Sequence, residues 1–141
     1  MANWKDTVSA LQTKWDTDIA TPYSVQTQYN NDGTFELDDE SLGTYSCWAR
    51  VFTLMGEDIQ IDISPNPSFR TAGIFRIQLF TPLEYGEANL LTLADLIRLA
   101  FLATTVGDIT YRTPSIGNPR REDNWWRVDI SCPFRTDRTK T

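Results

Sequence analysis

The chain has 141 residues, of which 40% are hydrophobic, 12% aromatic and 23% charged, and its formal net charge is −6. This length suits one domain with a single core, and the composition is too apolar for a disordered chain. The absence of histidine excludes Ser-His-Asp and Cys-His nucleophiles, and the acidic balance argues against bulk binding of nucleic acids or anionic membranes.

The N-terminal residues 3–19 are predicted to form an amphipathic helix capped by Asn3 and ended by the Thr21-Pro22 pair. Its apolar side chains recur at steps of three and four residues, which places them on one face: Trp4, Val8, Leu11, Trp15 and Ile19. Residues 23–29 alternate as a first strand, and a turn follows at residues 30–33.

Four carboxylates lie between Glu36 and Glu40. A calcium loop with Gly33 at its sixth position would begin at Gln28, which lacks the required carboxylate, and would end at Asp39 instead of a glutamate. The segment is therefore predicted to be a solvated acidic loop without a metal.

Residues 45–54 are rich in aromatic and β-branched side chains and predict a central strand. A turn at residues 55–58 and an alternating strand at 59–63 complete a predicted hairpin. Residues 64–71 contain two prolines and predict an extended loop. Phe69 and Arg70 on this loop are candidate contact residues, although Phe69 packing back onto the sheet is the alternative.

The rest of the chain predicts a strand at 72–81, a helix at about 87–104, a short strand at 109–113 and a last strand at 124–134. A Pro-rich and Arg-rich loop covers residues 114–121, and residues 135–141 are predicted to be a flexible polar tail. Apolar alternation in the last strand puts Trp126, Val128, Ile130, Cys132 and Phe134 on one face.

The predicted helix at 87–104 is apolar nearly all round, which favours burial on more than one side, including against a neighbouring subunit. Asp95 and Arg98 are among its few polar residues, and the apolar window is too short to span a bilayer. Cys47 and Cys132 are predicted to be buried thiols of a reducing cytosol, with a disulfide as the alternative.

Charge is unevenly distributed along the chain. Residues 1–111 carry 6 basic and 15 acidic side chains, whereas residues 112–141 carry 7 basic and 4 acidic ones. An acidic body with a basic docking patch would account for this distribution, and so would chance segregation that folding mixes in space. The sequence leaves both interpretations open.

Together these elements predict a single α+β domain over residues 1–141, with a mostly antiparallel twisted sheet, two helices and the order α-β-ββ-β-α-β-β. No nucleotide-binding, zinc or nucleophile motif is present in the sequence, so we expect neither an enzyme nor a cofactor. Trp125 and Trp126 beside Arg120, Arg121 and Arg127 resemble a stacking platform for single strands, but Trp126 fits the core face and the molecule is acidic.

Several segments resemble the tail terminator, or tail completion, proteins of long-tailed bacteriophages. The resemblance spans about residues 48–101 and rests on these motifs: Trp48-Ala-Arg-Val51, Gly56-Glu57, Arg70-Thr-Ala-Gly73-Ile-Phe-Arg-Ile-Gln78-Leu-Phe80-Thr-Pro82, Gly86 and Leu93-Ala-Asp95-Leu-Ile97. It implies a structural protein that assembles as a hexameric ring on the last ring of the tail tube, stops its polymerisation and offers a surface to the neck.

The resemblance further implies a virion protein at the head-proximal end of the tail, assembled in the bacterial host cytoplasm. Its expected partners are its own copies, the tail tube protein and a neck or head-completion protein, with genomic DNA passing through the channel without specific binding and no membrane contact. The residues predicted to contact neighbours or partners are Phe69, Arg70, Arg76, Gln78, Tyr85, Asp95, Arg98, Arg120, Arg121, Trp125 and Arg127.

We also expect carboxylates to outnumber basic residues on the channel surface, since like charge lets DNA slide. Two alternatives remain open at this level. One is a head-completion or neck connector on the portal side, and the other is a monomeric domain with a small-molecule pocket.

Overall fold

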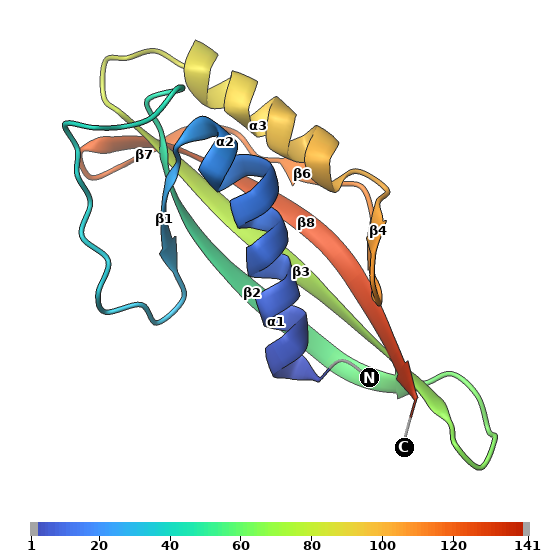
Figure 1. Cartoon of the computed structure of the whole chain (residues 1–141). Coiled ribbons are helices and arrows are strands. Elements are labelled where there is room, and N and C mark those ends of the chain that lie inside the picture. The colour runs from blue at the N-terminus through green and yellow to red at the C-terminus, as the bar shows by residue number, and fades with distance from the viewer. Residues whose placement is uncertain (1–2, 140–141) are drawn as a thin grey trace.

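The computed structural model describes residues 3–139 (Figure 1). Helix α1 (Trp4–Trp15) is capped by Asn3, whose side chain accepts a hydrogen bond from the Asp6 N–H at 2.9 Å. A π-helical turn, η1 (Asp16–Ala20), and a final turn, α2 (Thr21–Tyr23), continue it.

The prediction that the helix ends before Thr21-Pro22 was wrong. Pro22 lies at the start of the final turn, where a missing N–H is tolerated, and Ser24 ends the helix with a left-handed φ of 55°. Tyr23 therefore belongs to the helix, and the first strand, β1 (Gln26–Tyr29), is shorter than predicted.

The face of α1 toward the core carries Leu11 and Trp15, followed by Ile19 in η1, and all three are buried. The Trp15 indole donates a hydrogen bond of 2.9 Å to the Thr27 hydroxyl in β1. Trp4, predicted to join this stripe, is 50% exposed, so the buried stripe begins further along the helix.

Strand β2 (Trp48–Gln60) is continuous, so the predicted hairpin between 45–54 and 59–63 was wrong. Its partner is β3 (Ser68–Pro82), and the register shifts between Met55 and Asp58 as in a β-bulge. A Cβ added at Gly56 would lie 2.7 Å from the Ala72 carbonyl oxygen, so the bulge requires a glycine there. The turn-like sequence at 55–58 therefore encodes a bulge within one long strand.

The eight-stranded sheet has the order β1-β2-β3-β8-β5-β4, and two short strands, β6 and β7, also pair with β8. β1 is parallel to β2 and every other pair is antiparallel. The remaining bounds are α3 (Ala88–Phe101), β4 (Thr105–Val106), β5 (Ile109–Tyr111), β6 (Ser115–Ile116), β7 (Arg120–Glu122) and β8 (Trp125–Thr139). The predicted α+β class with a mostly antiparallel sheet is confirmed.

The C-terminal segment corrects the predicted flexible tail. Arg135 to Thr139 continue β8 and pair with the first residues of β3, and Thr136 is buried. The polar character of this segment misled the prediction, because β3 and β5 supply hydrogen-bonding partners that are distant in the sequence. Residues 140 and 141 of the predicted tail lie outside the described residues.

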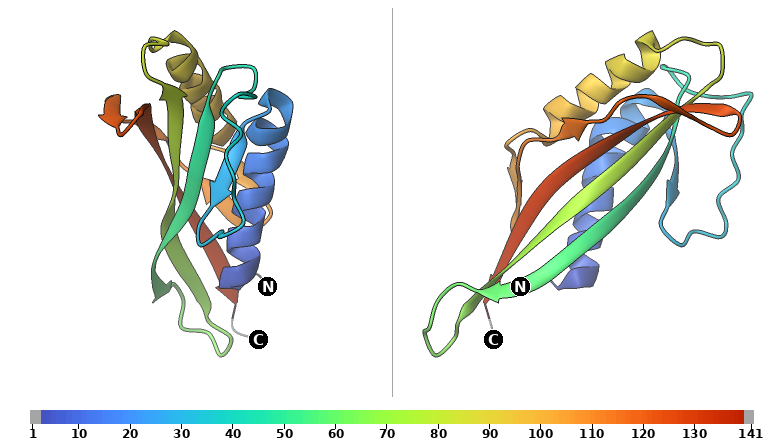
Figure 2. Two further views of the ribbon diagram at one scale, coloured as in Figure 1. Left: turned by 90° about the vertical axis from the view of Figure 1, so that its left-hand side faces the viewer. Right: turned by 180° about the vertical axis from the view of Figure 1, so that it is seen from behind.

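Both long helices cover the same face of the sheet, as the side view shows (Figure 2). The predicted alternation is confirmed in β3, where Phe75, Ile77 and Leu79 are buried. It is also confirmed in β8, where Val128, Ile130, Cys132 and Phe134 are buried and Trp126 packs against the core. α3 adds Leu90, Leu93, Ala94, Ile97 and Phe101.

Cys47 and Cys132 are buried free thiols in this core, as predicted. Burial raises the pKa of each thiol to about 12. Among the described residues, no helix is long and apolar enough to cross a membrane.

Candidate interaction surface on the open face of the sheet

The second face of the sheet carries no helix, and we call it the open face (Figure 2). Alternate residues of β2, β3, β7 and β8 share it, because the register aligns them across the strands. Its charged members are the arginines 50, 70, 76, 120, 127 and 135 and the carboxylates Glu122, Asp129 and Asp137. The open face is therefore net positive, although the whole chain is net −6.

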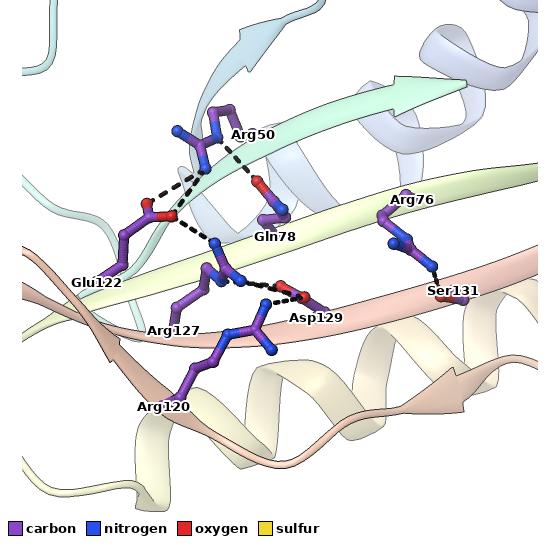
Figure 3. Close-up of polar contacts among 8 residues, drawn as sticks. All are labelled: Arg50, Arg76, Gln78, Arg120, Glu122, Arg127, Asp129 and Ser131. Carbon is purple, nitrogen blue, oxygen red and sulfur yellow. Dashed lines mark hydrogen bonds and ion pairs between the residues drawn. The ribbon is translucent and has the colours of Figure 1, made fainter. Parts of the chain in front are cut away.

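A connected polar network lies across the middle of the open face (Figure 3). Arg50 Nε donates to the Gln78 Oε1 atom at 2.8 Å, and Arg50 Nη2 lies 3.2 Å from Glu122 Oε2. Glu122 also accepts from Arg127. The network ties β2, β3, β7 and β8 together and fixes the directions of its side chains.

Arg127 is only 8% exposed, so its charge needs compensation within the fold. Glu122 supplies one contact, and the Nε atom of Arg127 lies 3.1 Å from Asp129 Oδ1 as an ion pair that is not aligned as a hydrogen bond. Arg120 Nη2 shares Asp129 at 3.0 Å. Two carboxylates thus pair with three arginines, so this network carries one excess positive charge.

Arg76 adds a second excess charge. Its Nη2 atom donates to the Ser131 hydroxyl at 3.2 Å, and its buried Nε atom has no hydrogen-bond partner among residues 3–139. No carboxylate of the described chain forms an ion pair with it. A half-buried guanidinium without a counter-charge favours contact with an acidic group from outside the chain.

An aromatic cluster lies at one end of the open face. Trp48 stacks on Phe80 with ring centroids 4.3 Å apart and meets the edge of Trp125 at 5.6 Å. Phe35, from the loop after β1, also stacks on Trp48, with ring centroids 5.9 Å apart. Trp125 is therefore a packing residue of this cluster and only partly available to a partner.

Toward the other end of the sheet, a cleft of about 520 Å³ is lined mainly by apolar residues, including Leu54, Ala72, Ile74 and Pro133. Three arginines border it: Arg70, Arg112 and Arg135. Arg70 is held by two hydrogen bonds to Asp137, at 2.8 and 3.0 Å, and this contact holds the pKa of Asp137 below its usual range.

Beyond the cleft, β2 and β3 project away from the helices as a hairpin (Figure 2), and we call residues 57–69 the arm. Ile59, Ile61 and Ile63 are 62%, 43% and 97% exposed. The sequence predicted their alternation, but they were not among the predicted contact residues. The available signal was the alternation of three isoleucines next to the Pro-containing segment 64–71.

The structure brings six predicted contact residues together on the open face: Arg70, Arg76, Gln78, Arg120, Trp125 and Arg127. Phe69 and Arg70 lie within β3 and not on a loop, which corrects the predicted boundary, and Phe69 faces the opposite side of the sheet. Arg121 is exposed and donates to the Asp123 carbonyl at 2.9 Å.

The other predicted contact residues lie away from this surface. Tyr85 is exposed in the loop before α3, and Asp95 and Arg98 lie on α3 without an ion pair between them among the described residues. Leu99 on the same helix is exposed. One side of α3 is thus buried in the core, and its burial by a neighbouring subunit stays a prediction.

The acidic loop is held by a side chain. The Gln26 amide donates to the carbonyl oxygens of Asp38 and Ser41 at 2.8 and 3.1 Å, and its oxygen accepts from the Asp38 N–H at 2.9 Å. Within residues 3–139, no group of three His, Cys, Asp or Glu side chains is arranged to hold a metal ion.

Comparison with known proteins identifies the family. The model of the phage tail terminator proteins matches residues 9–134. The chain belongs to the phage tail terminator family. No curated protein sequence matches it.

One solved structure superposes on this chain with a TM-score of 0.62 at 14% sequence identity, and the superposition covers 91% of this chain and 94% of the other. That likeness concerns the fold alone. Family membership confirms the resemblance drawn from residues 48–101 and identifies a structural protein of the phage tail.

Proposed function

We propose that this protein forms a hexameric ring that caps the tail tube, ends its polymerisation and provides the attachment surface for the neck at the head-proximal end. The observation that carries the proposal is the family match over residues 9–134. A protein with this task acts by geometry, which agrees with a chain that has no histidine to titrate near neutral pH.

The surfaces of the chain support assembly. The arm and α3 expose large apolar side chains, among them Ile63 and Leu99. Such exposed apolar groups mark protein–protein contacts when they gather in patches. The arginine-rich open face adds charges that an acidic partner would neutralise.

The charge distribution also suggests how the ring is oriented. DNA should pass through the channel without binding to its wall. Because basic side chains bind phosphates, the channel surface should carry more carboxylates than basic side chains. Because the open face is net positive, we expect it to point away from the channel, toward a neighbouring subunit, the tube protein or the neck protein. The rest of the chain is strongly acidic, which is the charge that we expect on the channel surface.

The experiment combines native mass spectrometry with electron microscopy of tube ends. The protein is measured alone and after mixing with its cognate tail tube protein. We expect six copies per ring and rings at one end of tubes whose length stops increasing. Twelve copies would instead indicate a connector on the portal side, and tubes that continue to grow with bare ends would refute capping.

The orientation has a separate test. A map of the ring at side-chain resolution should show carboxylates in excess along the bore. A bore lined by Arg50, Arg76 and Arg127 would refute the proposed orientation and leave the capping function intact.

A further inference from the structure

The arm exposes three isoleucines, Ile59, Ile61 and Ile63. The bulge between Met55 and Asp58 changes the alternation, so that Ile59 pairs with Arg70 and lies on the open face. Ile61 donates its N–H to the Ser68 carbonyl and follows on the same face. Without the bulge, these isoleucines would face the side on which the helices pack.

The cleft at the base of the arm has complementary chemistry. Its floor is formed by the apolar side chains of Leu54, Ile74 and Pro133, and its border carries Arg112 and Arg135. Neither arginine forms an ion pair within the described chain. The cleft volume, about 520 Å³, is ample for apolar side chains of the size of isoleucine.

The arm also carries charge of the opposite sign. Glu57 is exposed, and Asp62 accepts hydrogen bonds from Ser64 and from the Ser68 N–H. These contacts hold the pKa of Asp62 below its usual range, so it is ionised at neutral pH. The arm contains three carboxylates, Glu57, Asp58 and Asp62, and no basic side chain, so its charge is opposite to that of the arginines that line the apolar cleft.

Ile61 of the arm cannot reach Ile74 in the cleft of its own chain. Ile61 lies beside Ser68, six residues along β3 from Ile74, which corresponds to roughly 20 Å in a strand. The arm continues the sheet away from the cleft (Figure 2). The matching surface must therefore come from another molecule.

We propose that the arm of one copy seats its isoleucines in the cleft of the next copy, as the contact that joins neighbouring subunits. Each copy carries both an arm and a cleft, and in a ring its arm and its cleft meet different neighbours, so the contact we propose is head-to-tail and repeats around an axis until the ring closes. This inference rests on the proposed ring and names the surfaces that build it.

Disulfide trapping tests the contact. A chain with Ile61→Cys and Ile74→Cys cannot bridge within itself, because a disulfide requires Cα atoms less than about 7 Å apart. Cys47 and Cys132 compete little, because both are buried and their pKa values are raised to about 12. Under mild oxidation we expect covalent species up to six chains.

Matched controls separate this contact from others. Val106→Cys with Ile74→Cys should give no cross-linked species, although Val106 is also exposed, at 47%. Ile61→Cys alone should give no dimer, and a strong dimer there would show arm-to-arm contact and overturn the inference. Ile63→Asp should reduce assembly at least tenfold with unchanged circular dichroism, whereas Val106→Asp should not. An equal loss of assembly in Ile63→Asp and Val106→Asp would also overturn the inference.

The outcomes distinguish the inference from the proposed function. A six-fold wild-type ring without the Ile61–Ile74 disulfide in the double variant would refute the arm contact and leave the ring. A cross-linked series that ends at two chains would support the contact and refute the ring. Absence of both the ring and the disulfide would refute both.

Discussion

Gly73 lies where three strands and the core meet, and replacing it with alanine should destabilise the fold. A Cβ at this position would lie 2.7 Å from the Leu54 carbonyl oxygen and 2.6 Å from the Phe134 Cζ atom. Both neighbours are constrained, since the carbonyl belongs to the β2 backbone and the Phe134 ring is buried. The added methyl group therefore has to displace a strand or a core ring.

The magnitude follows from these contacts. Overpacking of this kind costs about 1–3 kcal/mol, and the reduced freedom of the unfolded chain offsets about 0.4–1 kcal/mol. Because the methyl group meets both a backbone carbonyl and a core ring, the upper part of the overpacking range applies, about 2–3 kcal/mol, and the net loss should be about 1–2 kcal/mol. Unfolding entropy is about 2.1 cal/mol/K per residue, so a 141-residue chain should lose about 3–7 °C in Tm.

The assay is thermal and urea unfolding followed by circular dichroism. Gly33→Ala is the matched control, because a Cβ there has nothing within 4 Å, and its stability should change by less than about 0.5 kcal/mol. Phe134→Leu shortens the clashing ring, so the double variant should be more stable than the sum of the two single changes predicts. A Gly73→Ala protein that melts with the wild type would refute the steric argument.

Three further predictions concern charges and thiols. Arg127→Met should lower the free energy of unfolding in urea by about 1.5–3 kcal/mol, because Glu122 and Asp129 lose the buried arginine that pairs with both of them. Arg121→Met is the control: at this exposed site the free energy of unfolding should change by less than about 0.5 kcal/mol. The contact with Arg70 lowers the pKa of Asp137 in the folded state, so the ion pair stabilises the fold above the ordinary carboxyl pKa of about 4, and this stabilisation is lost as the pH falls further. In Asp137→Asn, the free energy of unfolding should therefore fall less steeply with decreasing pH. Cys47 and Cys132 should resist a thiol reagent at pH 8 and react once urea unfolds the chain, and rapid modification of the folded protein would contradict their burial.

Local patterns predicted much of this fold because burial repeats at short range. The alternation in residues 72–81 and 124–134 identified the buried faces of β3 and β8, and the apolar steps of 87–104 identified α3. These predictions needed only the neighbouring side chains. The sequence also indicated an arginine-rich contact surface.

The predictions that failed depended on partners far away in the chain. The residues at 55–58 look like a turn, and only the pairing of β2 with β3 on both sides of them shows that they form a bulge. Residues 135–139 look like a tail, and only β3 makes them a strand. Pro22 is the exception, because its failure is local: it looks like a helix stop but lies within a further helical turn, Thr21–Tyr23.

The sequence by itself determined the fold class, the buried faces and the family, since these follow from periodicity and from motifs within one segment. Only the tertiary structure decided which charges share a face. Arg50, Arg76 and Arg127 come from three strands, and the register of those strands places them together on an open face of positive charge. It also decided, through one bulge, that Ile59 and Ile61 lie exposed on the open face and not on the side of the core.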